Sequence, residues 1–154
     1  MTVEIGKPAP KFEMPTDGGG TVSLAALKGR RVVLYFYPKD DTPGCTTEAC
    51  GFRDALPKFG KINATVIGVS RDSVAAHDRF KAKYKLPFTL ASDADGKAST
   101  AYGTWVEKNM YGRKYMGMER STFLIDEKGI VRGIWRKIKV AGHVEEVLKA
   151  VKAL

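Results

Sequence analysis

The chain contains two cysteines, Cys45 and Cys50, in a segment whose sequence predicts a helix. A cysteine thiolate is a strong nucleophile and a good metal ligand, so this pair could support redox chemistry, nucleophilic catalysis or metal binding. A metal site would need more ligands, and the only histidines, His77 and His143, lie far away in the sequence on predicted helices. We therefore expect no metal and no cofactor, and we interpret both histidines as helix residues without a catalytic role.

Cys45 is expected in the first turn of its helix, directly after the loop from Pro38 to Gly44. The free backbone N–H groups and the positive end of the helix dipole favour an anion there, which for cysteine is the thiolate. A static structural disulfide is not expected either, because the sequence shows no secretory signal. The position of Cys45 therefore indicates a reactive cysteine.

The spacing of the two cysteines limits how they can bond. Five residues along an ideal helix give about 7.5 Å of rise and roughly 140° of rotation. The two Cα atoms would then lie about 8–9 Å apart, beyond the usual disulfide range of about 4.4–6.8 Å. A disulfide between Cys45 and Cys50 therefore requires at least one helical turn to unwind. A redox cycle that uses both cysteines is predicted to involve local unfolding.

Alternating strands and helices surround the cysteines. The segment from Arg31 to Tyr37 is apolar and aromatic without polar alternation, which predicts a strand buried on both faces. A helix is expected to follow from Thr42 or Gly44 to about Leu56, with Pro43 acceptable at its first position. The next elements are expected to be a strand, a helix and a strand: Ala64 to Ser70, Asp72 or Ser73 to Tyr84, and Pro87 to Ala91.

The two ends of the chain are predicted to add hairpins and a last helix. Strands from Lys11 to Met14 and from Thr21 to Ser23 form an N-terminal hairpin, and Ser23 caps a short helical turn that Gly29 ends. The later elements are a small helix, an irregular segment, a β-hairpin and an amphipathic helix: Gly96 to Tyr102, 103 to 119, Ser121 to Asp126 with Ile130 to Arg136, and Gly142 to Leu154.

This order predicts an α/β protein with a central mixed β-sheet flanked by helices on both faces. The arrangement is that of a thioredoxin-like fold with an N-terminal β-hairpin extension. We expect residues 1–154 to form a single domain, because no repeat or linker interrupts the pattern.

The loop and the first cysteine spell P-x-x-x-T-x-x-C from Pro38 to Cys45, and the sequence continues Cys45-Thr-Thr-Glu-Ala-Cys50. With this motif at a helix start after a buried strand, the chain resembles the peroxiredoxins, and most closely their bacterioferritin-comigratory-protein (Q-type) branch. The resemblance covers almost the whole chain. It includes three further segments: Gly6 to Pro10, Val69-Ser70, and Arg120 to Asp126.

The resemblance implies a thiol peroxidase that reduces hydrogen peroxide and organic hydroperoxides in antioxidant defence. Cys45 matches the peroxidatic cysteine, whose thiolate attacks the O–O bond and becomes a sulfenic acid. Cys50 matches the resolving cysteine, which then forms an intramolecular disulfide with Cys45. Thr42 matches the residue that orients the peroxide, Arg120 the arginine that stabilises the thiolate, and Pro38 the proline that shields the site from water.

The same resemblance implies a substrate site and a reductant. Thr42, Gly44, Cys45 and Arg120 are expected to bind the peroxide, and a thioredoxin-type protein is expected to reduce the disulfide. Because both cysteines lie on one helix, no partner chain is needed and a monomer is expected. Glu48, one turn after Cys45, could contact a nearby arginine or the reductant, but we interpret it as a surface salt-bridge residue.

Composition limits the other classes of function. The formal net charge is +9, which is compatible with binding nucleic acid or anionic membranes, but the 26 basic residues are scattered along the chain. We expect no dedicated nucleic-acid role. The longest apolar run, Val32 to Tyr37, is too short to span a bilayer, so no membrane association is expected. The first six residues do not resemble a signal peptide, which favours a cytoplasmic location.

Two alternatives to a peroxidase remain open at this stage. The first is a thiol–disulfide oxidoreductase of the same fold, although such proteins usually carry a C-x-x-C motif that this chain lacks. The second is a basic nucleic-acid-binding or chaperone-like protein in which the cysteines are incidental.

Overall fold

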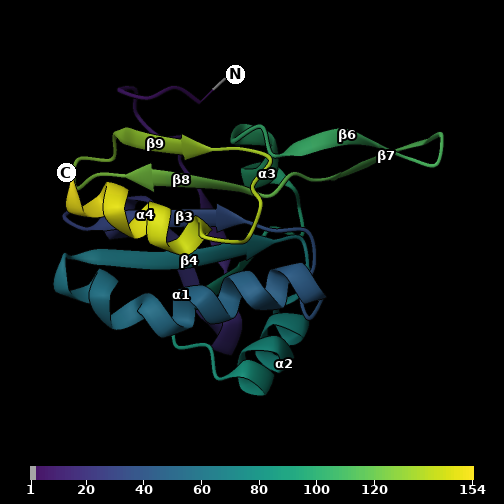
Figure 1. The fold of residues 1–154 in the computed structure, drawn as a ribbon, viewed down its shortest axis with the longest axis horizontal. Coiled ribbons are helices and arrows are strands. Elements are labelled where there is room, and N and C mark those ends of the chain that lie inside the picture. Colours follow the sequence, from purple (N-terminus) through teal and green to yellow (C-terminus); the bar gives the residue numbers. More distant parts are fainter. Residues whose placement is uncertain (1–2) are drawn as a thin grey trace.

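A five-stranded mixed sheet with the strand order β5-β4-β3-β8-β9 forms the centre of the molecule (Figure 1). This computed structural model describes residues 3–154. The three strands β3, β4 and β5 are parallel, β8 runs antiparallel to β3, and β9 runs antiparallel to β8. Their bounds are Arg31–Phe36, Ala64–Ser70, Thr89–Ser92, Ser121–Ile125 and Val131–Trp135 for β3, β4, β5, β8 and β9.

Helices cover both faces of this sheet, as predicted for a thioredoxin-like fold. One face packs against α1, α2 and α4, which span Pro43–Lys61, Val74–Tyr84 and His143–Lys152 (Figure 1). The opposite face packs against the short helix α3 (Lys97–Ala101) and the N-terminal segment. Since β3 lies in the middle of the sheet with both faces covered, its residues 32 to 36 are at most 1% exposed.

Several predicted elements match the observed ones closely. The second buried strand has the predicted bounds, and α2 runs to Tyr84 with Ser73 as its N-cap, whose hydroxyl accepts a hydrogen bond from the N–H of Ala76 at 3.1 Å. The N-terminal hairpin consists of β1 (Glu13–Pro15) and β2 (Thr21–Ser23). The β8–β9 hairpin and α4 also confirm the prediction.

Helix α1 is longer than predicted. The predicted end near Leu56 falls just before Pro57, and proline has no N–H for the helical hydrogen bond. The helix instead continues through Pro57 to Lys61. Phe59 in this extension is fully buried, and its ring centre lies 6.0 Å from that of Phe52 on the same helix. We attribute the continuation to the burial of Phe59, which offsets the missing hydrogen bond.

The prediction of an irregular segment at 103 to 119 was wrong. Strands β6 (Trp105–Met110) and β7 (Arg113–Met118) form an antiparallel hairpin that projects from the body of the molecule (Figure 1). Its turn residues, Tyr111 and Gly112, have φ values of 52° and 78°, the positive pair typical of a type I′ turn. A tyrosine is unusual in that turn, and strands exposed on both faces lack the apolar alternation that reveals strands in a sequence.

Of the helices within residues 3–154, none is long and apolar enough to cross a membrane.

Candidate active site

Cys45 lies in the first turn of α1, where the sequence predicted it. Thr42 is the N-cap residue with extended backbone angles, and Pro43 is the first residue of the helix. The side chain of Cys45 is buried, with 1% exposure, so its sulfur is largely shielded from water. A thiolate in this position faces the unpaired N–H groups of the helix start.

Arg120 reaches this sulfur from a distant part of the chain. It directly precedes β8, which pairs with β3 so that Ser121 lies opposite Phe36, close to the start of the loop. The Nη2 atom of Arg120 donates to Sγ of Cys45 at 3.2 Å. Gly44 leaves room for this approach, because a Cβ at that position would lie 3.2 Å from Nη2, a tight contact. Pairing of β3 with β8 therefore brings together two residues that are 75 positions apart.

Glu48 is not the surface residue that the sequence suggested. It lies one turn after Cys45 on the same face of α1, is fully buried, and accepts a hydrogen bond from Nη1 of Arg120 at 2.7 Å. Burial raises the pKa of Glu48 to about 7, although the charge of Arg120 acts in the opposite direction. The guanidinium thus uses one nitrogen for the thiol and another for a carboxyl group that titrates near neutral pH.

Tyr35 on β3 packs against α1, the helix that carries this site. Its ring stacks on Phe52 of α1, with centroids 4.7 Å apart. Burial, and then the charges of Glu48 and Cys45, raise its pKa well above the ordinary value. Within residues 3–154 its hydroxyl has no hydrogen-bond partner, and the same holds for Oε2 of Glu48. Gly68 leaves room for this hydroxyl, because a Cβ there would lie 2.8 Å from it.

The loop before α1 has a defined internal structure. The hydroxyl of Thr42 donates to the carbonyl oxygen of Lys39 at 2.8 Å, so its lone pairs remain available to accept a hydrogen bond. Thr42 is half-buried, whereas Pro38 at the start of the loop is exposed.

The two histidines have partners that the sequence did not reveal. His77 on α2 is fully buried, and its Nδ1 lies 2.6 Å from Oδ2 of Asp40 in the loop. His143, in the first turn of α4, lies with its Nε2 2.9 Å from Oγ1 of Thr122, and burial lowers its pKa to about 4. The first contact could not be predicted from the sequence, because Asp40 and His77 are 37 positions apart.

Cys50 lies farther along the same unbroken helix and is half-buried, and both cysteines are free thiols. Its neighbour Gly51 faces α4 so closely that a Cβ would lie 2.9 Å from Cγ2 of Val144. The segment that must unwind to join the cysteines is therefore packed against α4. In the part of the chain that the structure describes, no group of three or more His, Cys, Asp or Glu residues is placed to hold a metal ion.

Comparison with known proteins now decides between the remaining alternatives. Residues 5–134 match the model of the AhpC/TSA family. The chain belongs to this family. It is 52% identical to peroxiredoxin Bcp of Bacillus subtilis over 152 residues, which cover 99% of this chain and 97% of that protein.

Solved structures place this AhpC/TSA protein in the same branch. The bacterioferritin comigratory protein of Xanthomonas campestris is 49% identical, with a TM-score of 0.89 over 92% of this chain and 90% of that chain. A cysteine-to-serine mutant of PrxQ from Xylella fastidiosa is 44% identical, with a TM-score of 0.94 over 98% and 96%. The chain is thus a peroxiredoxin of the Bcp or Q-type branch and a thiol peroxidase, which confirms the predicted fold and enzyme class.

Proposed function

We propose that Cys45 is the peroxidatic nucleophile and that Arg120 stabilises its thiolate during attack on a peroxide. The observation that carries this proposal is the 3.2 Å contact between Nη2 of Arg120 and the buried Sγ of Cys45 at the start of α1. Helix N–H groups and a guanidinium both stabilise negative charge, and burial strengthens these interactions.

The chemical step exchanges one bond for another. The thiolate of Cys45 attacks the peroxide oxygen that carries the hydrogen, and the S–O bond forms as the O–O bond breaks. The second oxygen leaves as hydroxide or alkoxide and takes a proton from solvent to become water or an alcohol. The cysteine becomes a sulfenic acid. Charge moves from sulfur to the leaving oxygen, and the guanidinium of Arg120 can follow it because it presents several N–H donors in a fixed plane.

The other residues of the proposed site bind and orient the peroxide. Thr42 is expected to accept a hydrogen bond from the peroxide O–H, because its own proton is donated to the carbonyl of Lys39. Gly44 is assigned to the site since it leaves room for Arg120. Pro38 begins the loop, and its role in shielding the site from water remains a prediction.

Cys50 is proposed to resolve the sulfenic acid. Its sulfur attacks the sulfur of Cys45, an S–S bond forms, and the sulfenic oxygen leaves as water. The first turns of α1 must unwind for this step, because both cysteines lie on one regular helix. A thioredoxin-type dithiol then returns two electrons and two protons and restores both thiols.

The substrate range, assembly and compartment are also proposals. A relative from Xanthomonas campestris is described by its alkyl peroxide reduction activity, which supports organic hydroperoxides as substrates beside hydrogen peroxide. A monomer suffices, since both proposed redox cysteines lie on α1. The need for a thiol reductant supports the cytoplasm, which keeps thiols reduced.

A coupled assay tests the roles of the two cysteines. Peroxide consumption is measured with a thioredoxin recycling system for the wild type, Cys45→Ser and Cys50→Ser. We expect Cys45→Ser to be inactive, and Cys50→Ser to consume one equivalent of peroxide and then stop. Activity of Cys45→Ser equal to that of the wild type would reject the proposal, and continued turnover by Cys50→Ser would reject the role of Cys50.

A further inference from the structure

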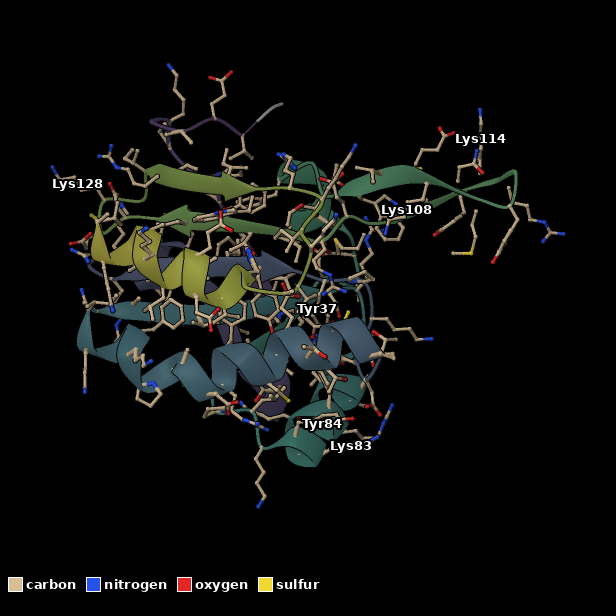
Figure 2. All side chains as sticks on the ribbon, viewed as in Figure 1. Tyr37, Lys83, Tyr84, Lys108, Lys114 and Lys128 are labelled. Atoms are coloured by element: carbon tan, nitrogen blue, oxygen red, sulfur yellow. The ribbon has the colours of Figure 1, made fainter. Side chains whose placement is uncertain are left out.

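Two consecutive aspartates hold the loop between β3 and α1 against α2. On the surface, the carboxylate of Asp41 accepts hydrogen bonds from Lys83 and from the hydroxyl of Tyr84, both at 2.8 Å. These two residues lie on α2 in Figure 2. Asp41 has a φ of 58°, a conformation that is strained for a non-glycine residue and persists only where neighbouring contacts hold it. The second contact is the buried pair of Asp40 and His77.

The partners of His77 show how many protons this pair holds. The Nε2 atom lies 2.9 Å from the carbonyl oxygen of Ala91 on β5, which can only accept, so Nε2 carries a hydrogen. A neutral imidazole has one N–H, so a bare Nδ1 would then face an ionised carboxylate across 2.6 Å. Two acceptors do not approach in this way. The contact therefore holds a second proton, shared between His77 and Asp40.

The hydrogen bonds and charges around the pair determine how strongly it holds this proton. The hydroxyl of Tyr37, the residue after β3, donates to Oδ1 of Asp40 at 2.5 Å. The backbone N–H of Asp40 donates to Oδ2 of Asp72, before α2, at 2.9 Å. Burial lowers the pKa of His77. The hydrogen bond and charge of Asp40 and the charge of Asp72 together raise it by more, so the pKa lies above its ordinary value.

We propose that His77 is a positioning residue for the peroxide site, and that the proton it shares with Asp40 keeps the loop from Pro38 to Gly44 in its substrate-binding shape. This inference rests on the proposed role of Cys45. When the proton is lost at alkaline pH, two acceptors face each other and the pair separates. The loop that carries Thr42 then loosens, and oxidation of Cys45 by peroxide slows.

Asp40→Asn is the sharpest test, because it should reverse the pH dependence. The amide N–H₂ of an asparagine can donate to a bare Nδ1 of neutral His77, while the amide oxygen still accepts from Tyr37. This bond needs no extra proton, and protonation of His77 breaks it. The loop is then held at alkaline pH and released at acidic pH, opposite to the wild type. His143→Gln is the matched control, since it removes the other buried histidine, which lies on α4.

The first measurement is the second-order rate constant for oxidation of Cys45 by hydrogen peroxide in single turnovers, from acidic to alkaline pH. The ratio of the Asp40→Asn rate to the wild-type rate at each pH removes the pH effects that the two proteins share. We expect this ratio to rise with pH by on the order of tenfold, because a loosened loop should cost less than the roughly 100-fold of a 1 Å misplacement. The ratio for His143→Gln should stay constant. A constant ratio for Asp40→Asn would overturn the proposal.

The second measurement does not depend on turnover. Histidine ¹⁵N resonances are recorded in the Cys45→Ser background, where Nδ1 of His77 should be protonated at neutral pH with Asp40 and bare with Asp40→Asn. A bare Nδ1 beside the native Asp40 would overturn the proposal even if the enzyme is active. If the wild type instead consumes no peroxide, the proposed function fails, and the resonances still decide whether the shared proton exists.

Discussion

Glu48 is the residue whose environment differs most from its sequence context. A glutamate at the second turn of a polar helix usually faces solvent, but this side chain points into the core, where Nη1 of Arg120 is 2.7 Å away. The ion pair therefore combines a fully buried carboxyl group with a guanidinium that is 16% exposed. Removal of a charge from water opposes ionisation, and the pKa of about 7 shows that this cost exceeds the attraction of Arg120.

The raised pKa of Glu48 predicts a specific pH dependence of stability. Since the folded-state pKa is about 7 against an ordinary 4.5, the contribution of neutral Glu48 is complete below about 4.5 and is lost as pH rises through 7. The expected loss is on the order of 3 kcal/mol in the free energy of unfolding. Glu48→Gln should remove this loss, as measured by denaturant unfolding of the reduced protein at a series of pH values from about 4.5 to above 7.

A control variant separates this effect from general changes in charge. Glu145→Gln alters an exposed glutamate on α4 and should keep the wild-type pH dependence. If Glu48→Gln also keeps it, the carboxyl group of Glu48 does not titrate as described.

Gly44 tests the approach of Arg120 to the sulfur. In Gly44→Ala the new Cβ lies 3.2 Å from Nη2, so the guanidinium must shift by a few tenths of an ångström from its position beside Cys45. We expect the second-order rate constant for peroxide to fall on the order of tenfold, as for a misplaced catalytic group. Gly60→Ala is the matched control in the same helix, where a Cβ meets no atom within 4 Å. Equal rates for Gly44→Ala and the wild type would show that the contact does not matter.

At the scale of the element, α1 must be both a rigid support and a segment that unwinds. Gly51 follows Cys50 directly and lowers the helix propensity of this segment. The same glycine is needed for packing, because a Cβ there would meet Val144 of α4. The weak point of the helix therefore coincides with its contact with α4.

The double variant Gly51→Ala with Val144→Ala should slow disulfide formation. Truncation of Val144 makes room for the new methyl group, and alanine stabilises the helix by about 1 kcal/mol relative to glycine. The fraction of molecules in which this segment is unwound should therefore fall about fivefold relative to Val144→Ala alone. The rate of Cys45–Cys50 bond formation after a peroxide pulse measures this effect. Gly60→Ala, near the end of α1, should leave the rate unchanged, and an unchanged rate in the double variant would mean that resolution does not require unwinding there.

The sequence predicted the elements whose patterns are local. The uninterrupted apolar run of β3, the cap at Ser73 and the first turn of α1 all depend on neighbouring residues, and each matches the structure. The end of α1 was not predicted correctly, because it depends on the burial of Phe59 in the folded core, which the neighbouring residues do not reveal. The β6–β7 hairpin was not predicted, because Tyr111 is not a typical residue for the turn that joins its strands.

At the scale of the whole molecule, the site is assembled from segments that only the fold brings together. Cys45 and its loop were found from their motif, but Arg120 was assigned only through the family resemblance, because 75 positions separate it from the thiol. The buried state of Glu48 and the pairing of Asp40 with His77 depend on three-dimensional packing. Neither feature produces a recognisable pattern in the sequence.

The exposed hairpin gives a test of the proposed monomer. Tyr111 is 99% exposed and Met110 56%, and both lie at the tip of the projecting ribbon, on which Figure 2 labels Lys108 and Lys114. Met110→Ser with Tyr111→Ser should change the free energy of unfolding by less than about 0.5 kcal/mol, as for other exposed residues. Light scattering should give one chain mass of 16.9 kDa with and without the changes. A larger mass that falls in the variant would identify the hairpin as an interface between copies.

The central claim is that Cys45 is oxidised first and that Cys50 resolves it within the same chain. Peptide mass mapping under non-reducing conditions, after one equivalent of hydrogen peroxide, tests it most directly. We predict a single intramolecular link between Cys45 and Cys50, with lower amide protection from hydrogen exchange at residues 45 to 51. Free Cys45 after peroxide is consumed, or disulfides only between chains, would contradict the account.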